Sequence, residues 1–589
     1  MKNIRPFLFL SFCLILTGCD GTNYKKLYSE YIAKYPDYTG DKKTFVDDYK
    51  NNRLDLDIKF ETFKGSKVET QKAHKGEKIT ITQKSTLTNY SFAGWYKTES
   101  LEEEIQYSFV ADASVTFYAK FDPQCFSTFY VGDEVYQHLV IEDDGKVKKP
   151  DDPTKVGFQF DCWLDEEGEE YNFDTIVTGK SVKLYAKFSY DFLELPAIII
   201  NTDDGEDIVS REEYKDSKVS VLNTQNSYLM NEIAAGVRGR GNSSWNWYPK
   251  KPYRIKFNKK QAMFGSSYKA KSWTLIANYQ DKSLMRNYLA YELSKQIQPS
   301  RFTSVHIPVE LYLNGDYKGV YLLCDQMQVG DGRVEIDESI ADDGNNGYFF
   351  EVDSRAGDGD VYFEFKGQKI VIKSPDTEDA EFINKKDIEI NYLSSYLEEC
   401  SDALDDEPWS RVDELIDVNS FVDAYLIDEL FMNVDAGHTS AFYYKDIDGK
   451  LTKGPVWDFD MAAGNVNYGP GDVDECPADS TLFVRENHFW YQKLLNRTEF
   501  VNLFKTKLSA VQTNINNLLE LIDKDNQDNV YFQNKESFNR NFDRWPTMGE
   551  YVQPEPKSVY ELASVLDQME YVRRWLSTRY NYLVATYIG

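Results

Sequence analysis

An internal repeat in the N-terminal third constrains the fold of this 589-residue chain more than any other feature. The run "FAGWYKTES" at Phe92 corresponds to "FDCWLDEEG" at Phe160, 68 residues later, and "FYAKF" at Phe117 corresponds to "LYAKF" at Leu184, 67 residues later. Two offsets that agree within one residue indicate two copies of one domain. Because each copy alternates apolar and polar residues over short runs, we predict two small β-rich modules, over residues 57–122 and 123–190.

The two modules resemble the Listeria–Bacteroides surface repeat, in which a Gly-Trp-Tyr turn and a closing Leu-Tyr-Ala-Lys strand recur. Members of that family act as spacers or as binding units on cell surfaces, and we expect a spacer here. The second copy departs from the pattern, because Cys162 stands where the first copy has Gly94. Its turn is therefore expected to differ.

The first residues, "MKNIRPFLFLSFCLILTGCDG", are typical of a secretion signal. Lys2 and Arg5 precede an apolar run, Pro6 to Leu16, that is too short for a comfortable membrane span. The following "LTGC" resembles the bacterial lipoprotein cleavage box, which would make residues 1–18 a signal peptide and Cys19 the lipidated first residue of the mature chain. The alternative is an ordinary signal peptide with an accidental cysteine.

No later segment approaches the length of a membrane helix, so we expect an extracytoplasmic protein held at a bacterial membrane only by its N-terminal lipid. Loss of Lys2 and Arg5 with the signal would take the formal net charge from -30 to -32. Such an acidic surface disfavours nucleic acid and anionic membranes as partners, since nothing offsets phosphate repulsion. It also serves solubility, which is the commoner explanation.

Beyond Cys13 and Cys19 the chain has five cysteines, without the CxxC spacing of a zinc site. Only Cys125 and Cys162 lie in one small module, where a disulfide could form. Ahead of the repeats, residues 19–56 form the predicted lipid-anchored stalk. Aromatic and aliphatic residues recur there at helical spacing, interrupted by Pro36 and Gly40, which predicts two short helices.

From about Leu193 the chain mixes strands with helices, and we assign residues 191–589 to an α+β domain with a helical C-terminal region. The last hundred residues are predicted to be helical. One apolar face is marked by Val565, Met569, Val572, Leu576, Tyr580 and Leu583.

The segment "GVRGRGNSSWNWYPKKPYRIKF", from Gly236 to Phe257, sets three glycines among arginines and runs into an alternating strand. Glycines let backbone amides approach an anion, and arginines add charge-assisted hydrogen bonds, so the pattern suggests a phosphate cradle. A plain glycine-rich turn is the alternative. In the strand, Lys256 shares a face with Arg254 and is placed to reach a nucleotide phosphate, although lysines at such positions usually face solvent.

Two aspartates mark the predicted catalytic region. "NSFVDAYLIDELFMNVDAGHTSAFYY" predicts a helix capped by Asn419 that ends near Asn433, with Asp435 in the following loop. An aromatic strand, a turn and a returning strand then lead through Trp457 to Asp458. Since a tight hairpin brings its ends together, both aspartates should lie close, as in protein kinases.

Other catalytic signatures are absent from the sequence, which has no Walker loop, no HExxH and no GxSxG. Five histidines make a zinc enzyme or a serine triad improbable, and His438 is the one histidine near the predicted site. The runs "DSRAGDGDVYFE" and "DKDNQD" do not fit the spacing of a calcium-binding EF-hand, so we interpret both as solvated turns.

Five motifs occur in the order found in the spore-coat protein H (CotH) kinase family: "RGRGNSSW…KKPYRIKF", "NYQDKSLMRNYLAYELS", "GDYKGVYLLCDQ", "NVDAGHTSAFYY" and "VWDFDMAAGN". The resemblance covers about Leu193 to the C-terminus. Members are similar to atypical protein kinases with a two-lobed fold that binds ATP and a divalent metal, Mg²⁺ or Mn²⁺. In sporulating bacteria they phosphorylate serine-rich coat proteins, and relatives on fungal surfaces act as invasins.

The resemblance implies roles for individual residues. Asp435 would be the catalytic aspartate, and Asp458, with Asp460 beside it, would bind the metal. Arg286 would help to hold the lobes and the site together. The residues implied at the nucleotide are Arg238, Arg240, Gly241 and Asn242 at the phosphates, and Lys251 or Lys256 as the nucleotide lysine.

Two positions depart from the family pattern. Ser440 stands where kinases place the asparagine that holds a second metal, and a hydroxyl is a weaker magnesium ligand than an amide carbonyl. Asp325, in a motif we associate with the nucleotide site, stands where the family often has glutamate.

Two functions follow as hypotheses. The first is a surface lipoprotein kinase that transfers the ATP γ-phosphate to Ser or Thr of an extracytoplasmic, for example serine-rich, protein. The second is a weak or inactive kinase fold that acts as a surface adhesin or a carbohydrate- or protein-binding module. The intact Asp435 and Asp458 favour the enzyme, whereas Ser440, the lipid anchor, the repeats and the scarcity of external ATP favour the binder.

Overall fold

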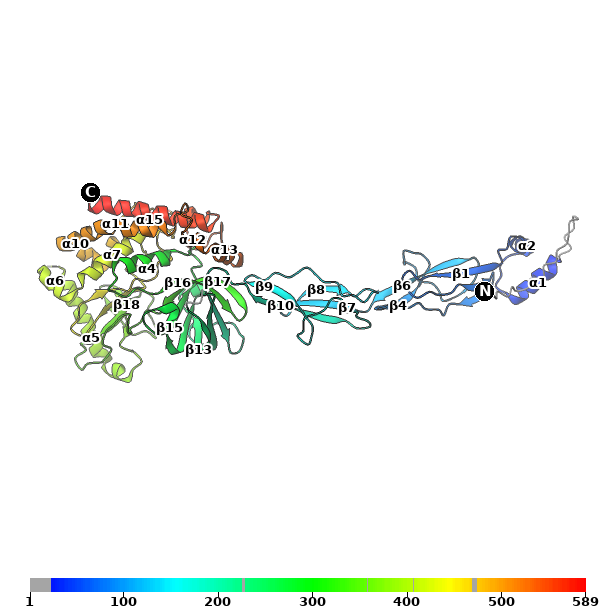
Figure 1. Cartoon of the computed structure of the whole chain (residues 1–589), viewed down its shortest axis with the longest axis horizontal. Coiled ribbons are helices and arrows are strands. Elements are labelled where there is room, and N and C mark those ends of the chain that lie inside the picture. The colour runs from blue at the N-terminus through cyan, green and yellow to red at the C-terminus, as the bar shows by residue number, and fades with distance from the viewer. Residues whose placement is uncertain (1–22, 225–227, 358, 406, 469–473) are drawn as a thin grey trace. The chain divides into compact units, whose positions relative to one another are not determined.

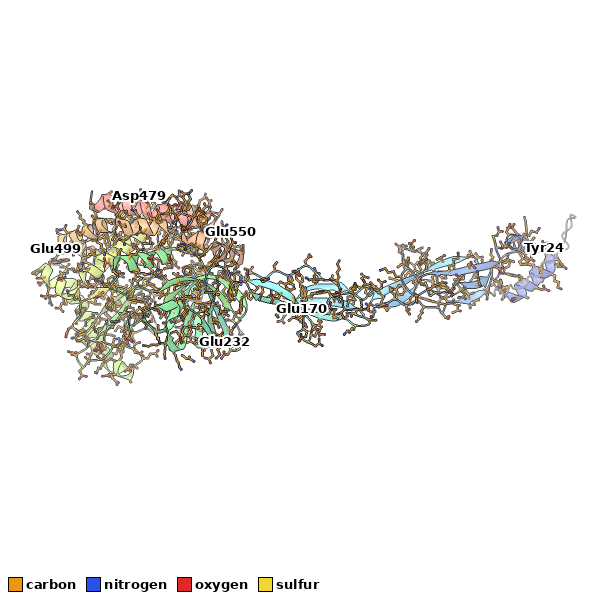
Figure 2. All side chains as sticks on the ribbon, viewed as in Figure 1. Tyr24, Glu170, Glu232, Asp479, Glu499 and Glu550 are labelled. Carbon is orange, nitrogen blue, oxygen red and sulfur yellow. The ribbon has the colours of Figure 1, made fainter. Side chains whose placement is uncertain are left out.

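The computed structural model describes residues 23–589 except 225–227, 358, 406 and 469–473. The predicted signal peptide and Cys19 lie outside the described residues. The chain divides into two compact units, the first ending at Ser189 and the second spanning Tyr190–Gly589 (Figure 1). Both units carry exposed acidic side chains, such as Glu170 in the first and Glu232 and Glu499 in the second (Figure 2).

The first unit opens with the two predicted helices, α1 (Tyr24–Lys34) and α2 (Lys42–Lys50). Asn23 and Asp41 cap them, because each side chain accepts a hydrogen bond from a backbone amide of the first turn. Pro36 and Gly40 lie in the connection, as expected. The prediction of two short helices is confirmed.

Two four-stranded sheets follow, one in each repeat, and their strand orders correspond. In both, the first strand pairs antiparallel with the second and parallel with the last. Trp95 and Trp163 occupy equivalent positions and are almost completely buried in the two cores. The strands are β1 (Asp55–Glu61), β2 (Gln71–His74), β4 (Tyr90–Tyr96) and β6 (Val115–Pro123), then β7 (Phe126–Val131), β8 (Glu134–Val140), β9 (Phe158–Leu164) and β10 (Val182–Tyr190), with a small pair, β3 (Lys78–Thr80) and β5 (Ser108–Val110), in the first repeat.

Two expectations about the repeats are wrong. Gly94 and Cys162 lie inside strands β4 and β9 rather than in turns, because the tryptophan that follows each must face the core. Cys125 and Cys162 are both free thiols. Strand β10 separates β9 from β7, which begins just after Cys125, and the alternation beside the inward Trp163 turns Cys162 to the opposite face.

The second unit begins with a closed barrel of seven strands in the order β11-β12-β13-β14-β15-β17-β16. Alternate residues of each strand fill it, for example Val237, Ile255 and Trp273, so the barrel interior is a packed core. Its strands are β11 (Ala197–Thr202), β12 (Lys215–Leu222), β13 (Met230–Gly239), β14 (Tyr253–Gln261), β15 (Ala270–Ile276), β16 (His306–Leu313) and β17 (Asp316–Asp325). The loops between them carry α3 (Ser243–Trp247), a 3₁₀ turn (Met263–Gly265) and α4 (Arg286–Ile297).

A second sheet, in the order β19-β20-β18-β21-β22, follows the barrel and is covered by helices (Figure 1). Its strands are β18 (Tyr348–Val352), β19 (Tyr362–Phe365), β20 (Gln368–Ser374), β21 (Ala441–Lys445) and β22 (Thr452–Lys453). The helices are α5 (Ala380–Ala403), α6 (Trp409–Leu415), α7 (Val418–Phe431), α8 (Phe483–Asn487), α9 (Phe489–Leu494), α10 (Thr498–Ala510), α11 (Gln512–Glu520), α12 (Val530–Gln533), α13 (Lys535–Arg544), α14 (Lys557–Tyr560) and α15 (Val565–Tyr587).

Helix α7 is the centre of this helical region, because every residue of it except Asn419 is buried. The predicted cap at Asn419 is therefore wrong. Asp417 is the N-cap, and its carboxylate accepts a hydrogen bond from the Ser420 amide. At the other end α7 stops at Phe431, near Asn433 as predicted, because Met432 adopts a left-handed conformation with φ 45°.

The returning strand that was predicted to reach Asp458 is also shorter than expected. Strand β22 ends at Lys453, and Pro455, which has no amide hydrogen, belongs to an irregular segment that leads to Asp458. One backbone hydrogen bond, from the Gly454 amide to the Phe442 carbonyl, still holds this segment against β21. The chain thus returns beside β21, although most of the return is not a strand.

Helix α13 joins the helical region to the barrel. Arg540 donates two hydrogen bonds of 2.7 Å to the buried carboxylate of Glu310 in β16. Lys250, completely buried, donates to Asn541 at 2.8 Å and to the Val320 carbonyl. Through these contacts the barrel and the helical region form a single compact unit. The multidomain architecture, with β-rich repeats before an α+β domain, is confirmed.

Helix α15 has the apolar face predicted from its sequence, since all six marker residues are buried. Within the stretch of chain that the structure describes, no helix is both long and apolar enough to span a membrane. Helix α15 instead packs on α7, and Arg579 forms an ion pair with Glu429 in which both side chains are 0% exposed. Arg579 also donates to the carbonyl oxygens of Ala478 and Thr481.

Replacing Arg579 should destabilise the protein strongly, because Glu429 would keep a buried charge without its partner. We expect Arg579→Met to lower the free energy of unfolding by about 3–5 kcal/mol, measured by urea unfolding of the whole chain. Arg574→Met on the same helix is the control, since its side chain is 65% exposed and its ion pair with Glu570 is 3.6 Å long. It should cost less than about 0.5 kcal/mol, and equal effects of the two changes would contradict the assignment.

Candidate functional site

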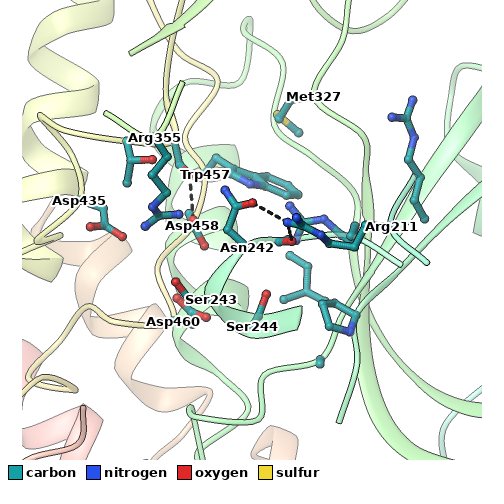
Figure 3. A pocket seen from close by; sticks show the side chains of 18 of the residues that line it. Arg211, Asn242, Ser243, Ser244, Met327, Arg355, Asp435, Trp457, Asp458 and Asp460 are labelled. Atoms are coloured by element: carbon teal, nitrogen blue, oxygen red, sulfur yellow. Dashed lines mark hydrogen bonds between the residues drawn. The ribbon is translucent and has the colours of Figure 1, made fainter. Parts of the chain in front are cut away.

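A cavity of about 320 Å³ lies between the barrel and the helical region of the second unit. That volume is within the range of small-molecule sites. Strands β13 and β14 and the loop between them contribute Arg238, Arg240, Gly241, Asn242 and Arg254. The loops around the second sheet contribute Asp353, Asp435, Ser440, Asp458 and Asp460. Figure 3 shows the aspartates on one side of the cavity and Arg211 on the other.

Asp435 and Asp458 reach this cavity by different routes. Asp435 lies in the turn after α7, where its carbonyl accepts hydrogen bonds from the amides of His438 and Thr439. Asp458 has a φ of 68°, and its carboxylate accepts a 2.9 Å hydrogen bond from the hydroxyl of Ser440, the residue before β21. The structure thus brings together the two aspartates that the hairpin pattern predicted to be close.

Phe459 lies between Asp458 and Asp460, directly after the apolar residues Val456 and Trp457, and its packing explains how both aspartates are placed. Its ring is completely buried and packs edge-on against Phe431 of α7, at 5.6 Å between centroids. Its amide donates to the Asn287 side chain at 2.8 Å. With Phe459 anchored in the core, the flanking Asp458 and Asp460 are directed to the cavity (Figure 3).

The aspartates repel one another. Burial and the neighbouring Asp458 raise the pKa of Asp435 to about 6, with a smaller contribution from Asp353 and an opposing one from Arg355. Burial, together with the charges of Asp458 and Asp435, raises the pKa of Asp460 well above its ordinary value. A cation bound among these carboxylates would relieve the repulsion.

The donors fit a hard divalent cation, because they are carboxylate and hydroxyl oxygens. Among the described residues, however, no three Asp, Glu, His or Cys side chains are close enough to hold a metal by themselves. Magnesium commonly binds one or two carboxylates and completes its shell with phosphate oxygens and water. The site therefore suits a metal that arrives with a phosphorylated ligand. Ser440, predicted as a metal ligand, donates its hydroxyl hydrogen to Asp458.

The glycines of the predicted phosphate cradle let neighbouring side chains of the protein itself pack closely against the backbone. A Cβ at Gly239 would lie 2.3 Å from the Trp245 ring, and one at Gly241, whose φ is +80°, would lie 2.3 Å from the Ser244 hydroxyl. They let α3 fold back beside the end of β13. The Arg211 guanidinium holds the same loop through the Gly241 carbonyl, at 2.8 Å, and the Asn242 side chain, at 2.7 Å (Figure 3).

Neither predicted nucleotide lysine lines the cavity. Lys251 donates to the Trp245 carbonyl at 2.5 Å and lies over the Trp245 ring. Lys256 is exposed and lies 5.7 Å from the centre of the Tyr214 ring. The described residues that line the cavity include five arginines and no lysine.

Arg286 and Asp325 also lie outside the cavity lining. Arg286 is completely buried, pairs with Asp281 at 2.6 Å and donates to the carbonyls of Ala462 and Ala463. It thereby fixes the chain that follows Asp460 to the start of α4. Asp325, at the end of β17, accepts hydrogen bonds from the Tyr268 hydroxyl and the Val305 amide.

Some cavity residues were not predicted. Arg211 and Glu351 gave no sequence signal, whereas Arg254 could have been found, since it precedes Lys256 on the same face of β14. Asp353 and Arg355 belong to the run that we interpreted as a solvated turn. The run begins with a turn in which Arg355 is exposed, as predicted, but both residues also line the cavity and Asp353 accepts a hydrogen bond from Thr439.

A barrel joined to a helix-rich region, with aspartates and arginines facing one cavity between them, is the arrangement expected of a two-lobed kinase-like domain. A family model described as CotH kinase protein matches residues 237–583, more than half of the chain. The chain therefore belongs to the CotH kinase protein family. A model of the Listeria-Bacteroides repeat domain matches residues 57–120 and 128–187, which confirms the predicted repeats.

The raised pKa of Asp435 predicts a pH-dependent stability. The pKa of Asp435 is about 6 in the folded protein and 3.8 ordinarily. The folded protein therefore loses stability as the pH rises from about 4 to 6, because Asp435 ionises less readily in the folded state than in the unfolded state. Without metal, Asp435→Asn should exceed the wild type by about 1–3 kcal/mol in free energy of unfolding at pH 8. The difference should shrink as the pH falls to 5.

Urea unfolding between pH 5 and 8 in a chelating buffer would measure this effect. Asp479→Asn is the control, because Asp479 is exposed and lies outside the cavity lining. A difference between Asp435→Asn and the wild type that does not vary with pH would contradict the electrostatic explanation.

Proposed function

We propose that the second unit is an atypical protein kinase that transfers the γ-phosphate of ATP to a Ser or Thr hydroxyl of an extracytoplasmic protein. The observation that carries the proposal is the meeting of Asp435 and Asp458 in one cavity opposite a set of arginines, in a chain of the CotH family. The substrate class, which includes serine-rich proteins, follows from the family resemblance.

In this proposal Asp435 orients the acceptor hydroxyl and accepts its proton. A pKa of about 6 leaves Asp435 ionised at neutral pH yet makes it more basic than an ordinary aspartate, which suits a general base. Asp458 and Asp460 would hold Mg²⁺ or Mn²⁺, which when bound offsets negative charge on the transferred phosphoryl group. Ser440 positions Asp458 through their hydrogen bond.

The barrel side of the cavity supports the nucleotide-binding role in the proposal. Arg238, Arg240 and Asn242 face the cavity and could contact phosphate oxygens. Apolar side chains on the same cavity, Met327 and Trp457, offer surface for a purine ring. No nucleic acid partner is proposed, because the protein is strongly acidic overall.

A second candidate is an inactive kinase fold that serves as a surface adhesin or a carbohydrate- or protein-binding module carried on spacer repeats. One observation favours it: neither Lys251 nor Lys256 reaches the cavity, so the lysine that kinases use for the nucleotide has no counterpart among the described lining residues. Ser440 in place of the second metal-binding asparagine points the same way.

Transfer of labelled γ-phosphate would distinguish the two. With Mg²⁺ or Mn²⁺ the wild type should label itself or a serine-rich acceptor, and Asp435→Asn and Asp458→Asn should each reduce the rate at least about 100-fold. Asp479→Asn is the matched control and should retain the wild-type rate. No transfer by the wild type, together with no metal-dependent nucleotide binding, would leave the binding module as the function.

We propose further that the protein is a lipoprotein anchored at a bacterial surface through Cys19. Produced at full length in a bacterium, the wild type should incorporate labelled palmitate and sediment with membranes. Cys19→Ala should abolish both, whereas Cys13→Ala, a second cysteine of the same leader, should change neither. Equal labelling of the two variants would contradict the assignment of Cys19.

A further inference from the structure

Four arginines gather on the barrel side of the cavity: Arg211, Arg238, Arg240 and Arg254. Arg238 and Arg254 are directly opposite each other on the paired strands β13 and β14. Like charges in this arrangement destabilise a sheet. Within the described stretches of the chain, none of the four forms an ion pair with a carboxylate. Burial and the like charges of Arg238 and Arg240 lower the pKa of Arg254.

The arginines also carry unused hydrogen-bond donors. The Nε atoms of Arg238 and Arg254 are buried and have no hydrogen-bond partner among the described residues. Among the described residues, the Arg254 side chain donates one hydrogen bond, 3.3 Å long, to the Ser272 hydroxyl. A buried donor without a partner is costly, so the protein without ligand maintains an unfavourable cluster here.

The guanidinium groups are nevertheless held in place. Arg238 lies 5.1 Å from the centre of the Tyr214 ring, and Arg240 lies 5.8 Å from that of Trp457. Arg211 is fixed by its bonds to Gly241 and Asn242. Contacts with aromatic faces orient a guanidinium while leaving its N–H groups free to bind an anion.

We propose that Arg211, Arg238, Arg240 and Arg254 form a clamp for a polyphosphate chain of at least two adjacent phosphates, which replaces the missing nucleotide lysine. One phosphate carries a charge of about −1.5 to −2, about half of what four guanidinium groups can offset. Several linked phosphates can also accept paired hydrogen bonds from several planar guanidinium groups at once. The identification of the chain as that of ATP rests on the proposed kinase function, whereas its binding does not.

Isothermal titration calorimetry would test the clamp with inorganic triphosphate, orthophosphate and ATP as separate ligands. The wild type should bind triphosphate more tightly than orthophosphate. Arg254→Gln and Arg238→Gln should each weaken triphosphate binding about 10- to 100-fold, because each removes charge-assisted hydrogen bonds. Arg254→Lys, which keeps the charge but not the planar fork, should fall in between, and the exposed Arg574→Gln on α15 should bind as the wild type does.

Thermal unfolding provides a readout that a purely structural role would not give. Without ligand, Arg254→Gln should unfold at the same temperature as the wild type or a few degrees higher, because the repulsion from Arg238 is relieved. With triphosphate it should lose the stabilisation that the wild type gains. A lower unfolding temperature without ligand, together with unchanged triphosphate binding, would overturn the clamp.

The three ligands also show whether the bound phosphates belong to ATP or to free polyphosphate. They test the clamp separately from the kinase proposal. ATP bound much more tightly than triphosphate identifies a nucleotide site, and equal affinities identify free polyphosphate as a ligand; both support the clamp. Triphosphate binding without phosphoryl transfer would leave the clamp standing and remove the kinase. Phosphoryl transfer with arginine variants that bind as the wild type, or orthophosphate bound as tightly as triphosphate, would overturn the clamp alone.

Discussion

The buried guanidinium of Arg286 is the interaction on which the candidate site depends most. It pairs with Asp281 beside α4 and holds the carbonyl oxygens of Ala462 and Ala463, just after Asp460. The acidic segment contains repelling carboxylates and is irregular in backbone, so it has no ladder of hydrogen bonds to fix it. Arg286 and the buried Phe459 therefore hold this segment in place, as strand hydrogen bonds would otherwise do.

Opposite charges are separated across the cavity rather than paired. The barrel presents arginines that lack ion pairs with carboxylates among the described residues. The second sheet and its loops present aspartates, and burial together with neighbouring carboxylates raises the pKa values of Asp435 and Asp460. Each wall is unfavourable by itself, and a ligand with phosphates and a divalent cation would satisfy both. The proposed kinase chemistry and the polyphosphate clamp both require this arrangement, with positive charge on the barrel wall and negative charge on the opposite wall.

Several elements were predictable from local sequence. The two repeats, the two N-terminal helices and the apolar face of α15 follow from periodicity, which needs no knowledge of distant partners. The meeting of Asp435 and Asp458 followed from a hairpin pattern, although only the short β22 pairs with β21 and one further hydrogen bond, from the Gly454 amide, extends the contact. The caps and strand ends were less predictable, because Asp417 and Asn419 are both good caps by composition.

The sequence by itself determined which chemistry the chain can hold, since a glycine- and arginine-rich segment and three aspartates are visible in it. Only the tertiary structure decided which residues face the cavity. Antiparallel pairing of β13 and β14 places Arg238 opposite Arg254, the loop before β12 brings Arg211 to the same cavity, and Lys251 and Lys256 lie outside its lining. The physical reason is that alternation along a strand determines only which of its two faces a side chain is on. What packs against that face depends on residues far away in the chain.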